Sequence, residues 1–278
     1  SQAAIPLGLV LALAVQNAVP PFATDMYSPA FPQVARDLST SAGSVGLTLT
    51  VFFIGMALGQ VAGGAVSDQR GRRLPMVVGG LVCACGAVVC ALAPNIGVLM
   101  AGRLLQGLGG GAAAVVGRAV LVDLAHGSQL ASVMSVLMAL GALAPMIAPV
   151  AGGAVLSVGT WRMVFWFLVG FGLFMTMMAF FFVPESLPPE RRQSGGLRRL
   201  ARGVGELVTH RAYLGYMLTS AFSGFAMFAY ISSSSFVLQE INGLSPMTFS
   251  VFFACTAGSQ MLLSVLNARL VRHASPRR

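Results

Sequence analysis

Residues 45–93 read VGLTLTVFFIGMALGQVAGGAVSDQRGRRLPMVVGGLVCACGAVVCALA, which is two apolar runs joined by one charged turn. A helix rises about 1.5 Å per residue, so about 20 residues cross a hydrocarbon layer of about 30 Å. The runs at 45–66 and 74–93 both have this length. The turn between them carries Asp68, Arg70, Arg72 and Arg73. This stretch therefore predicts two membrane-spanning helices that reverse direction at a charged loop.

Six further runs have the same length and character. They cover residues 5–27, 97–122, 131–157, 162–183, 213–238 and 247–270. The 278 residues are 56% hydrophobic and only 9% charged, whereas a soluble domain carries about 25% charged residues. A globular core could hide one or two such runs but not eight. The sequence therefore predicts an all-α polytopic membrane protein, and it excludes an ordinary cytosolic enzyme and a disordered chain. The run from Ile5 has no basic flank, so no cleavable signal peptide is predicted.

The basic residues lie mainly on one side of the predicted topology. Two arginines, Arg36 and Arg162, fall in loops on the other side. Thirteen follow the second, sixth and eighth runs: Arg70, Arg72, Arg73, Arg191, Arg192, Arg198, Arg199, Arg202, Arg211, Arg269, Arg272, Arg277 and Arg278. Arginine excess marks cytoplasmic loops, so we expect a bacterial inner-membrane protein with both termini in the cytoplasm. The basic loops would lie near lipid headgroups, with a specific lipid site as an alternative, and no nucleic-acid partner is predicted.

Two of the runs resemble each other. Residues 48–60 read TLTVFFIGMALGQ and residues 248–260 read TFSVFFACTAGSQ, with six of thirteen positions identical at an offset of 200. An even number of runs separates them, so they point the same way, as in transporters built from two parallel six-helix halves. We expect a complete six-helix bundle over 1–183, a basic linker over 184–211, and two helices of a second bundle over 212–278. By this reading four further helices are missing, and a longer chain or a second chain would supply them.

The charged turn carries the residues of a cytoplasmic latch. Gly71 permits a tight turn, and Asp68 can pair with Arg72. The pattern Gly64…Asp68…Gly71 followed by Arg72 and Arg73 resembles the major facilitator superfamily, although Gln69 stands where that family usually has a basic residue. The resemblance implies the major facilitator fold. Arg118 and Asp123, which end the fourth run, resemble a further family pattern and are expected to join the latch.

An arginine lies within the fourth predicted helix. Arg103 is six residues past Gly97, or about 9 Å inside the membrane, and Gln106 shares its face. Buried charge is costly in a membrane, so Arg103 is a functional candidate. The stretch resembles the fourth-helix motif of the superfamily, in which such an arginine is linked to proton transfer. The alternative is that Arg103 only fastens two helices together.

The fifth run carries two prolines four residues apart, which predict a bent helix. The full set is Gly141, Pro145, Pro149, Gly152 and Gly153. It resembles the antiporter motif of drug exporters in the superfamily, although Ala144 replaces the usual glycine. A generic kinked helix is the alternative.

The first run supplies an acid. Asp25 stands in ATDMYSPAFP at 23–32, and this stretch, with WR at 161–162, FWF at 165–167 and FVLQE at 236–240, resembles the Bcr/CflA drug-resistance branch. That branch exports drugs such as chloramphenicol and bicyclomycin in exchange for protons. An apolar cavity favours the protonated form of a carboxylate and a nearby arginine favours the ionised form. We therefore expect Asp25 to carry the proton and Arg103 to tune it. The alternative places Asp25 at the outer end of its helix, in water.

The predicted cavity wall is aromatic and methionine-rich, which suits promiscuous binding. Its candidates are Asn17, Phe22, Tyr27, Phe53, Met56, Gln106, Met138, Phe222, Phe225 and Tyr230. The sequence offers no nucleophile with a base, no phosphate-binding loop and no metal cluster, and its cysteines read as small core residues, so no enzyme activity, cofactor or metal is expected. The predicted function is drug efflux by proton antiport. The alternatives are an exporter or importer of one metabolite, and an inactive truncated protein that acts only as an assembly partner.

Overall fold

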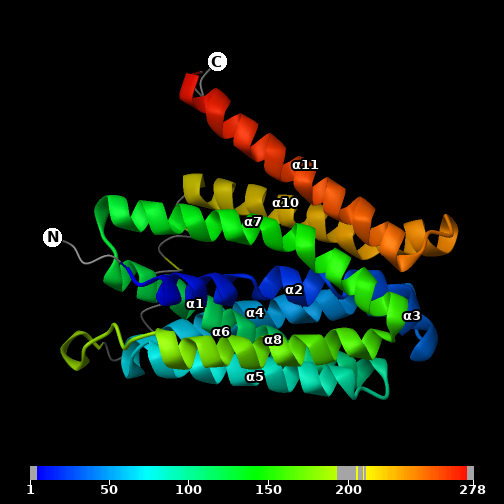
Figure 1. Ribbon diagram of the computed structural model, residues 1–278, viewed down its shortest axis with the longest axis horizontal. Coiled ribbons are helices and arrows are strands. Elements are labelled where there is room, and N and C mark those ends of the chain that lie inside the picture. Colours follow the sequence, from blue (N-terminus) through cyan, green and yellow to red (C-terminus); the bar gives the residue numbers. More distant parts are fainter. Residues whose placement is uncertain (1–4, 193–204, 206–208, 210, 274–278) are drawn as a thin grey trace.

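The computed structural model describes residues 5–192, 205, 209 and 211–273, with the backbone alone for 212, 265 and 267–273. Helices make up almost all of this part of the chain (Figure 1). Eight segments are long and apolar enough to cross a membrane: Leu7–Asp37, Ala42–Arg70, Arg73–Ala91, Ile96–Leu124, Gly127–Val158, Trp161–Phe182, Tyr213–Ile241 and Pro246–Ser264. The predicted all-α, eight-span fold class is confirmed. Much of the predicted linker, including Arg198, Arg199 and Arg202, lies outside the described residues.

The first segment is a chain of short helices and not one rod. It comprises α1 (Leu7–Asn17), α2 (Val19–Asp25), the 3-10 turn η1 (Ser28–Ala30) and α3 (Phe31–Asp37). Prolines stand at the start of α2, η1 and α3, where a missing N–H is tolerated and the fixed φ suits a helix. The segment therefore breaks but keeps its direction (Figure 1). The prediction that it ends at residue 27 is wrong, because these prolines restart the helix instead of ending it.

The remaining helices follow the predicted runs closely. They are α4 (Ala42–Arg70), α5 (Arg73–Ala91), α6 (Ile96–Leu124), α7 (Gly127–Val158), α8 (Trp161–Phe182), α10 (Arg211–Phe236), the π-helical turn η3 (Val237–Ile241) and α11 (Pro246–His273), with a 3-10 turn η2 (Pro189–Arg191) after α8. Among the described residues, side-chain caps define three starts: Ser41 accepts the Ser44 N–H, Asn95 accepts the Val98 N–H, and Ser245 accepts the Thr248 N–H.

Glycines bring α4, α5 and α6 into backbone contact. A Cβ at Gly55 or Gly59 of α4 would overlap the carbonyl of Leu104 or Leu108 in α6, and one at Gly111 of α6 would overlap the Met56 carbonyl. Small residues allow this close approach, which dispersion and packing then stabilise in a membrane. The glycine-rich sequence of α6 is therefore explained by two tight interfaces.

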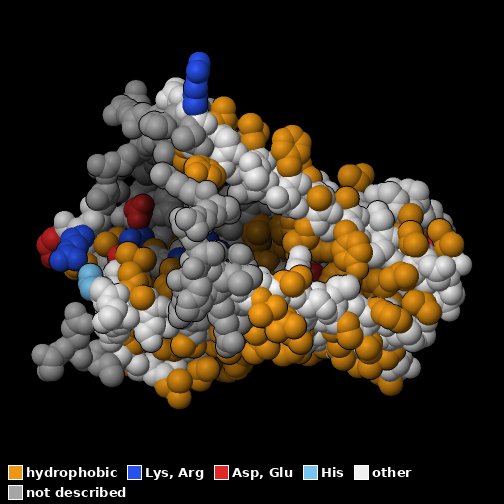
Figure 2. Space-filling view, turned by 90° about the horizontal axis from the view of Figure 1, so that it is seen from above, with side chains coloured by type: hydrophobic (Ala, Val, Ile, Leu, Met, Phe, Trp, Pro, Cys, Tyr) orange, Lys and Arg blue, Asp and Glu red, His pale blue; other side chains and the backbone are white. Residues whose placement is uncertain are grey.

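The helices form a packed group with α7, α10 and α11 on one side. In Figure 1, α5 and α8 lie at one edge, α7 and α10 lie across the middle segments, and α11 is outermost. Apolar side chains cover much of the surface in Figure 2. Leu58, Val78 and Phe181 are among the exposed large apolar residues. We call the end with Arg72 and Glu185 the basic end, and the end with Asp37 and Trp161 the far end.

Candidate functional site

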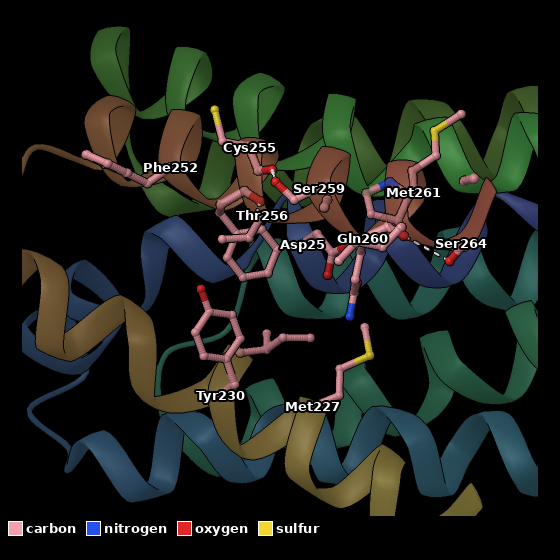
Figure 3. A pocket seen from close by; sticks show the side chains of 16 residues that line it. Asp25, Met227, Tyr230, Phe252, Cys255, Thr256, Ser259, Gln260, Met261 and Ser264 are labelled. Carbon is pink, nitrogen blue, oxygen red and sulfur yellow. Dashed lines mark hydrogen bonds between the residues drawn. The ribbon is translucent and has the colours of Figure 1, made fainter. Parts of the chain in front are cut away.

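A chamber opens between the first segment and the last two helices. Its volume is about 720 Å³, and α2, α7, α10 and α11 line it. Figure 3 shows Asp25, Tyr230 and Gln260 directed into it from three of these elements. An adjoining pocket of about 390 Å³ shares Asp25, Pro145, Met227 and Ile231 with the chamber. Asp25 is the one ionisable carboxylate among the described residues that line the two spaces.

Asp25 lies deep in the bundle. Eleven residues, in η1, α3 and the turns before them, lie between Asp25 and Asp37. Its side chain is 6% exposed, and Oδ1 accepts a hydrogen bond of 2.9 Å from the Thr24 hydroxyl. Among the described residues no cation forms an ion pair with it. The alternative that Asp25 is an outer-end residue in water is therefore excluded, because Asp25 is buried and the spanning segment Leu7–Asp37 continues well past it.

Arg103 lies behind this segment and is fully buried. Nη1 donates to the carbonyl of Ala23 at 2.9 Å and to Oε1 of Gln106 at 2.7 Å. The rings of Phe52, Tyr27 and Phe165 surround the guanidinium carbon at 4.4, 5.1 and 5.9 Å from their centroids. Within the described residues, Nε and Nη2 have no hydrogen-bond partner. The Arg103 guanidinium is therefore stabilised mainly by cation–π contacts with aromatic rings, where a buried arginine usually pairs with a carboxylate.

Asp25 and Arg103 are thus neighbours in structure but not partners in this conformation. The link between them is the backbone of α2: Arg103 binds the carbonyl of Ala23, and the Asp25 side chain turns into the chamber. This arrangement leaves one buried carboxylate and one buried guanidinium without a direct ion pair. A change in the α2 segment would alter both environments together.

The structure separates the predicted cavity residues into two groups. Asn17, Phe53, Met138 and Tyr230 line the chamber or its adjoining pocket. The others do not line those two spaces: Phe22 stacks on Phe167 and Phe171, Tyr27 and Gln106 contact Arg103, and Met56 packs on α6. Phe225 lines a separate pocket of about 680 Å³ between α4 and α10, together with Phe53, and Phe222 is exposed on α10. The assignment of these residues to the cavity wall stays a prediction, because a helix has several faces and an apolar sequence does not say which face a ligand contacts.

Several lining residues escaped the sequence analysis. They are Met227, Phe228, Ile231, Thr256, Ser259 and Gln260. Gln260 had a signal, since an amide within an apolar run is unusual. The others differ in no way from lipid-facing residues of the same helices, so only the packing reveals them.

The proline-rich helix α7 forms one wall. Pro145 and Gly141 line the pocket beside Asp25, and Pro149 lies within the helix. A Cβ at Gly152 would overlap the Met26 carbonyl, and one at Gly153 would overlap the Ser250 side chain of α11. These glycines therefore let α7 lie against both the Asp25 segment and α11.

The basic end carries a charge cluster centred on Arg72. Its guanidinium donates to Asp68 at 2.6 Å, to Ser67 at 2.8 Å and to Asp123 at 2.9 Å. Partial burial works against the charged guanidinium, but the bonds to Asp123 and Asp68 outweigh it and raise the pKa of Arg72 further. Arg73 instead contacts the Phe180 carbonyl and ring. The cluster joins the α4–α5 turn to the end of α6.

Glu185, which follows α8, completes this cluster and was not predicted. Its carboxylate accepts the N–H groups of Arg72 at 2.7 Å, Leu187 at 3.0 Å and Arg73 at 3.3 Å. Partial desolvation raises the pKa of Glu185, but these backbone hydrogen bonds outweigh it and the net pKa is lowered. Gly71 has φ +97°, and a Cβ there would collide with Glu185. The turn needs glycine for both reasons.

Two predicted members of the latch lie outside it. Arg118 forms no ion pair with the described acids and lines a pocket with Asn17, Met134 and Met138. Gly64 has open space where a Cβ would stand, so no close contact requires glycine there. The family resemblance placed Arg118 in the latch together with Asp123, which stands five residues later. That spacing turns the two side chains to different sides of α6.

The eight spans, the chamber between two groups of helices and the charge cluster define a polytopic membrane carrier. Residues 13–278 match the model of the Major Facilitator Superfamily, and the chain belongs to that family. The proteins of this family are membrane carriers without enzyme activity, and the eight apolar helices of the described residues agree with a multi-pass membrane protein. The predicted family resemblance is confirmed.

Known relatives include drug-resistance proteins. The chain is 39% identical over 249 residues to the uncharacterized MFS-type transporter YdgK of Bacillus subtilis, covering 89% of this chain and 62% of that protein. It is 35% identical over 262 residues to a bicyclomycin resistance protein homolog of Haemophilus influenzae, covering 94% and 66%. It is 29% identical over 244 residues to multidrug resistance protein MdtL of Escherichia coli, covering 88% and 61%. The chain therefore spans less than two thirds of the length of these relatives.

Solved structures share the fold. A bacterial homolog of the human lysosomal transporter Spinster, in an inward-facing and unoccupied conformation, matches with a TM-score of 0.77 at 18% identity, covering 98% of this chain and 63% of that chain. A D-xylose-proton symporter matches with a TM-score of 0.71 at 16% identity, covering 96% and 69%. At this identity the likeness concerns the fold alone.

Proposed function

We propose that the protein containing this chain exports small amphipathic molecules, drugs among them, in exchange for protons. The observation that carries the proposal is Asp25: a buried carboxylate that has no ion-pair partner among the described residues and that faces a chamber lined by α2, α7, α10 and α11. The similarity to relatives named for bicyclomycin and multidrug resistance supports the same substrate class. The chamber wall of Met227, Tyr230 and Phe252 suits varied apolar ligands.

In this proposal Asp25 takes up a proton from one side of the membrane and releases it to the other. Burial favours the protonated form of its carboxylate, and a positive charge or a polar ligand group in the chamber favours the ionised form. Arg103 tunes the exchange through the α2 backbone at Ala23, with Gln106 orienting its guanidinium. Rocking of the two bundles would expose the chamber to each side in turn.

The organisation of the chain in the membrane is part of the same proposal. The division into a bundle over 1–183, a basic linker over 184–211 and a second part over 212–278 assigns the chamber to the interface between two halves. The excess of arginine supports a cytoplasmic location for the basic end and for both termini in a bacterial cell. The Arg72 cluster would then act as a cytoplasmic latch that stabilises one conformation.

Asp25→Asn tests the proposal. We expect the variant to reach the membrane normally and to lose uncoupler-sensitive efflux, because an amide cannot carry the proton. Efflux is measured in a pump-deficient bacterial host with chloramphenicol, bicyclomycin and a cationic dye, with and without an uncoupler. The host expresses the 278-residue chain and, in parallel, the chain extended to the full length of its relatives.

Asp37→Asn is the matched control. Asp37 is also acidic and lies on the same segment, but it binds the Trp161 indole at 2.9 Å at the far end and lines no part of the chamber. It should retain efflux. Normal proton-driven efflux by Asp25→Asn would remove Asp25 from the role of proton carrier. If the uncoupler does not reduce efflux by the unmodified chain, facilitated export of a metabolite would be favoured over proton antiport.

A further inference from the structure

The segment that carries Asp25 has backbone carbonyls that its own helix cannot fully satisfy. Pro29 lacks the N–H that a regular helix would donate to the Asp25 carbonyl, and Pro32 lacks the one for the Ser28 carbonyl. The Ser28 hydroxyl donates to the Asp25 carbonyl at 3.3 Å. From its own segment, the Ser28 carbonyl receives the tighter bond from the Phe31 N–H. Buried carbonyls in a membrane need such partners, since water is absent.

Helix α10 and the π turn η3 that follows it supply further donors. The Ser235 hydroxyl donates to the Ser28 carbonyl at 2.7 Å. The Gln239 amide donates to the Pro29 carbonyl at 3.0 Å and to the Ser235 hydroxyl at 2.9 Å. Ser28 and Ser235 are fully buried. We name these four residues the carbonyl clamp.

The helical distortion at the end of α10 belongs to this clamp. Residues Val237–Ile241 form a π turn, and the Asn242 N–H binds the Val237 carbonyl. Gln239 lies in that turn, four residues after Ser235, and the two side chains meet on one face. Isolated π turns occur often at functional positions because they displace a helix face by one residue. Here the distortion coincides with the residue that reaches across to the first half.

We propose that Ser235 and Gln239 are positioning residues that close the chamber at the far end and fix the turn after Asp25. The inference rests on the proposed function, since it gives the clamp a role in moving the Asp25 segment. A chain of hydrogen bonds runs from Gln239 through Ser235 and Ser28 to the Asp25 carbonyl. Opening of the far end must break the two bonds that cross between the halves. Re-forming them returns the turn to the geometry seen here.

A second contact between α3 and the π turn η3 lies nearby and should stabilise the closed far end less. Arg36 and Glu240 form an ion pair of 3.5 Å, but both side chains are exposed. Exposed pairs contribute little, whereas buried bonds between polar groups that have no other partner contribute more. The clamp and not the ion pair should therefore control access at this end.

The test measures access to a thiol at the clamp and needs no transport. Ser234 is buried beside Ser235 and binds only the Ile231 carbonyl of its own helix. A Ser234→Cys reporter is placed in the 278-residue chain, purified in nanodiscs, with Cys83, Cys85, Cys90 and Cys255 replaced by alanine. The rate of modification by a charged maleimide is then compared between Ser235→Val and Ser235→Thr. The two side chains have nearly equal size, and only threonine keeps the hydroxyl.

We expect Ser235→Val and Gln239→Met each to raise the labelling rate about fivefold, the factor that corresponds to one net hydrogen bond of about 1 kcal/mol. Ser235→Thr should label at close to the unmodified rate. Ser233→Ala, an exposed neighbour, and Glu240→Gln should change nothing. Equal rates for the valine and threonine variants, or faster labelling in Glu240→Gln than in Gln239→Met, would overturn the proposal.

The same reporter separates this inference from the proposed function. Asp25→Asn should abolish efflux and leave the ratio between the Ser235→Val and Ser235→Thr labelling rates unchanged. If Asp25→Asn still exports by proton exchange, the proposed function fails while the labelling result stands. If the Ser235→Val and Ser235→Thr variants label at equal rates while Asp25→Asn is inactive, the proposal for the carbonyl clamp is overturned. The role of Asp25 as proton carrier is then still supported.

Discussion

Helices α4 and α11 are copies of one sequence pattern, yet they face different surroundings. In α4, Gly55, Gly59 and Gly63 recur every four residues and are buried against the backbone of α6. The positions 200 residues later are Cys255, Ser259 and Leu263 of α11. These three are exposed and line the chamber.

The residues at these positions fit the different surroundings of the two helices. Backbone contact needs glycine, because any Cβ at Gly55 or Gly59 would overlap a carbonyl of α6. A chamber wall needs side chains, and α11 supplies Thr256, Ser259 and Gln260. The two helices share the Phe–Phe pair and the glutamine. They differ at the glycine positions, which decide whether a helix packs against a neighbour or lines a cavity.

The largest expected effect is at this glycine face. Gly59→Val should destabilise the folded chain by about 3 kcal/mol or more and reduce the yield of inserted protein, since the new Cβ meets the Leu108 carbonyl. Thermal unfolding in detergent and the amount of monodisperse protein measure it. Ser259→Val, the same position of the other copy, should unfold within about 0.5 kcal/mol of the unmodified chain. Equal losses would show that α11 is packed in the same way as α4.

The second largest effect is expected at Arg103, the buried arginine of α6, which packs against α4. Arg103→Met should abolish proton-driven efflux and change stability by less than about 1 kcal/mol, because it removes a charge that no carboxylate neutralises together with two hydrogen bonds. Efflux and thermal unfolding are measured on the same preparations. Arg162→Met is the control: Arg162 is partly exposed, pairs with Asp37 at 3.8 Å and binds the Ala93 carbonyl. Equal loss of efflux in both variants would reduce Arg103 to a packing role.

A smaller effect concerns the turn that ends α4. The pKa of Glu185 is lowered in the folded chain, so its contribution to stability is present above the ordinary glutamate pKa of about 4.3 and is lost as pH falls through the folded value. Glu185→Gln should lower the unfolding temperature by about 2 °C at about pH 6, a modest shift because the group is exposed. The gap should close at about pH 3. A gap that persists there would mean that glutamine fails for a reason other than charge.

The smallest effect is chemical and leaves stability unchanged. Cys255 lines the chamber and is exposed, whereas Cys83 and Cys90 are buried. A small charged thiol reagent should therefore modify Cys255 in the folded chain and leave Cys83 and Cys90 free until unfolding. Mass spectrometry of peptides identifies the sites, and Cys255→Ser supplies the blank. Modification of Cys90 at the rate of Cys255 would contradict the packing of α5 on α6.

The fold was largely predictable from sequence, because each span is recognised from the length of its own apolar run. An apolar run of sufficient length has one stable state in a bilayer, and the Asp68–Arg73 turn identified the family. The first span was the exception, since four prolines within it could equally end or restart a helix. The site was less predictable. Asp25, Asn17, Tyr230 and the Asp68–Arg72–Asp123 ion pairs were found from residue type, but Glu185 and Thr256 carry no distinctive local signal.

What the sequence determined by itself is what depends on neighbours along the chain: eight helices, their charged turns and the repeat that relates α4 to α11. Tertiary structure alone decided which face of each helix is used. It turned Asp25 toward a chamber and Arg103 toward three aromatic rings, although both had been expected to meet. The physical reason is that helical periodicity fixes which residues share a face, but in an apolar helix hydrophobicity does not distinguish lipid, protein and cavity.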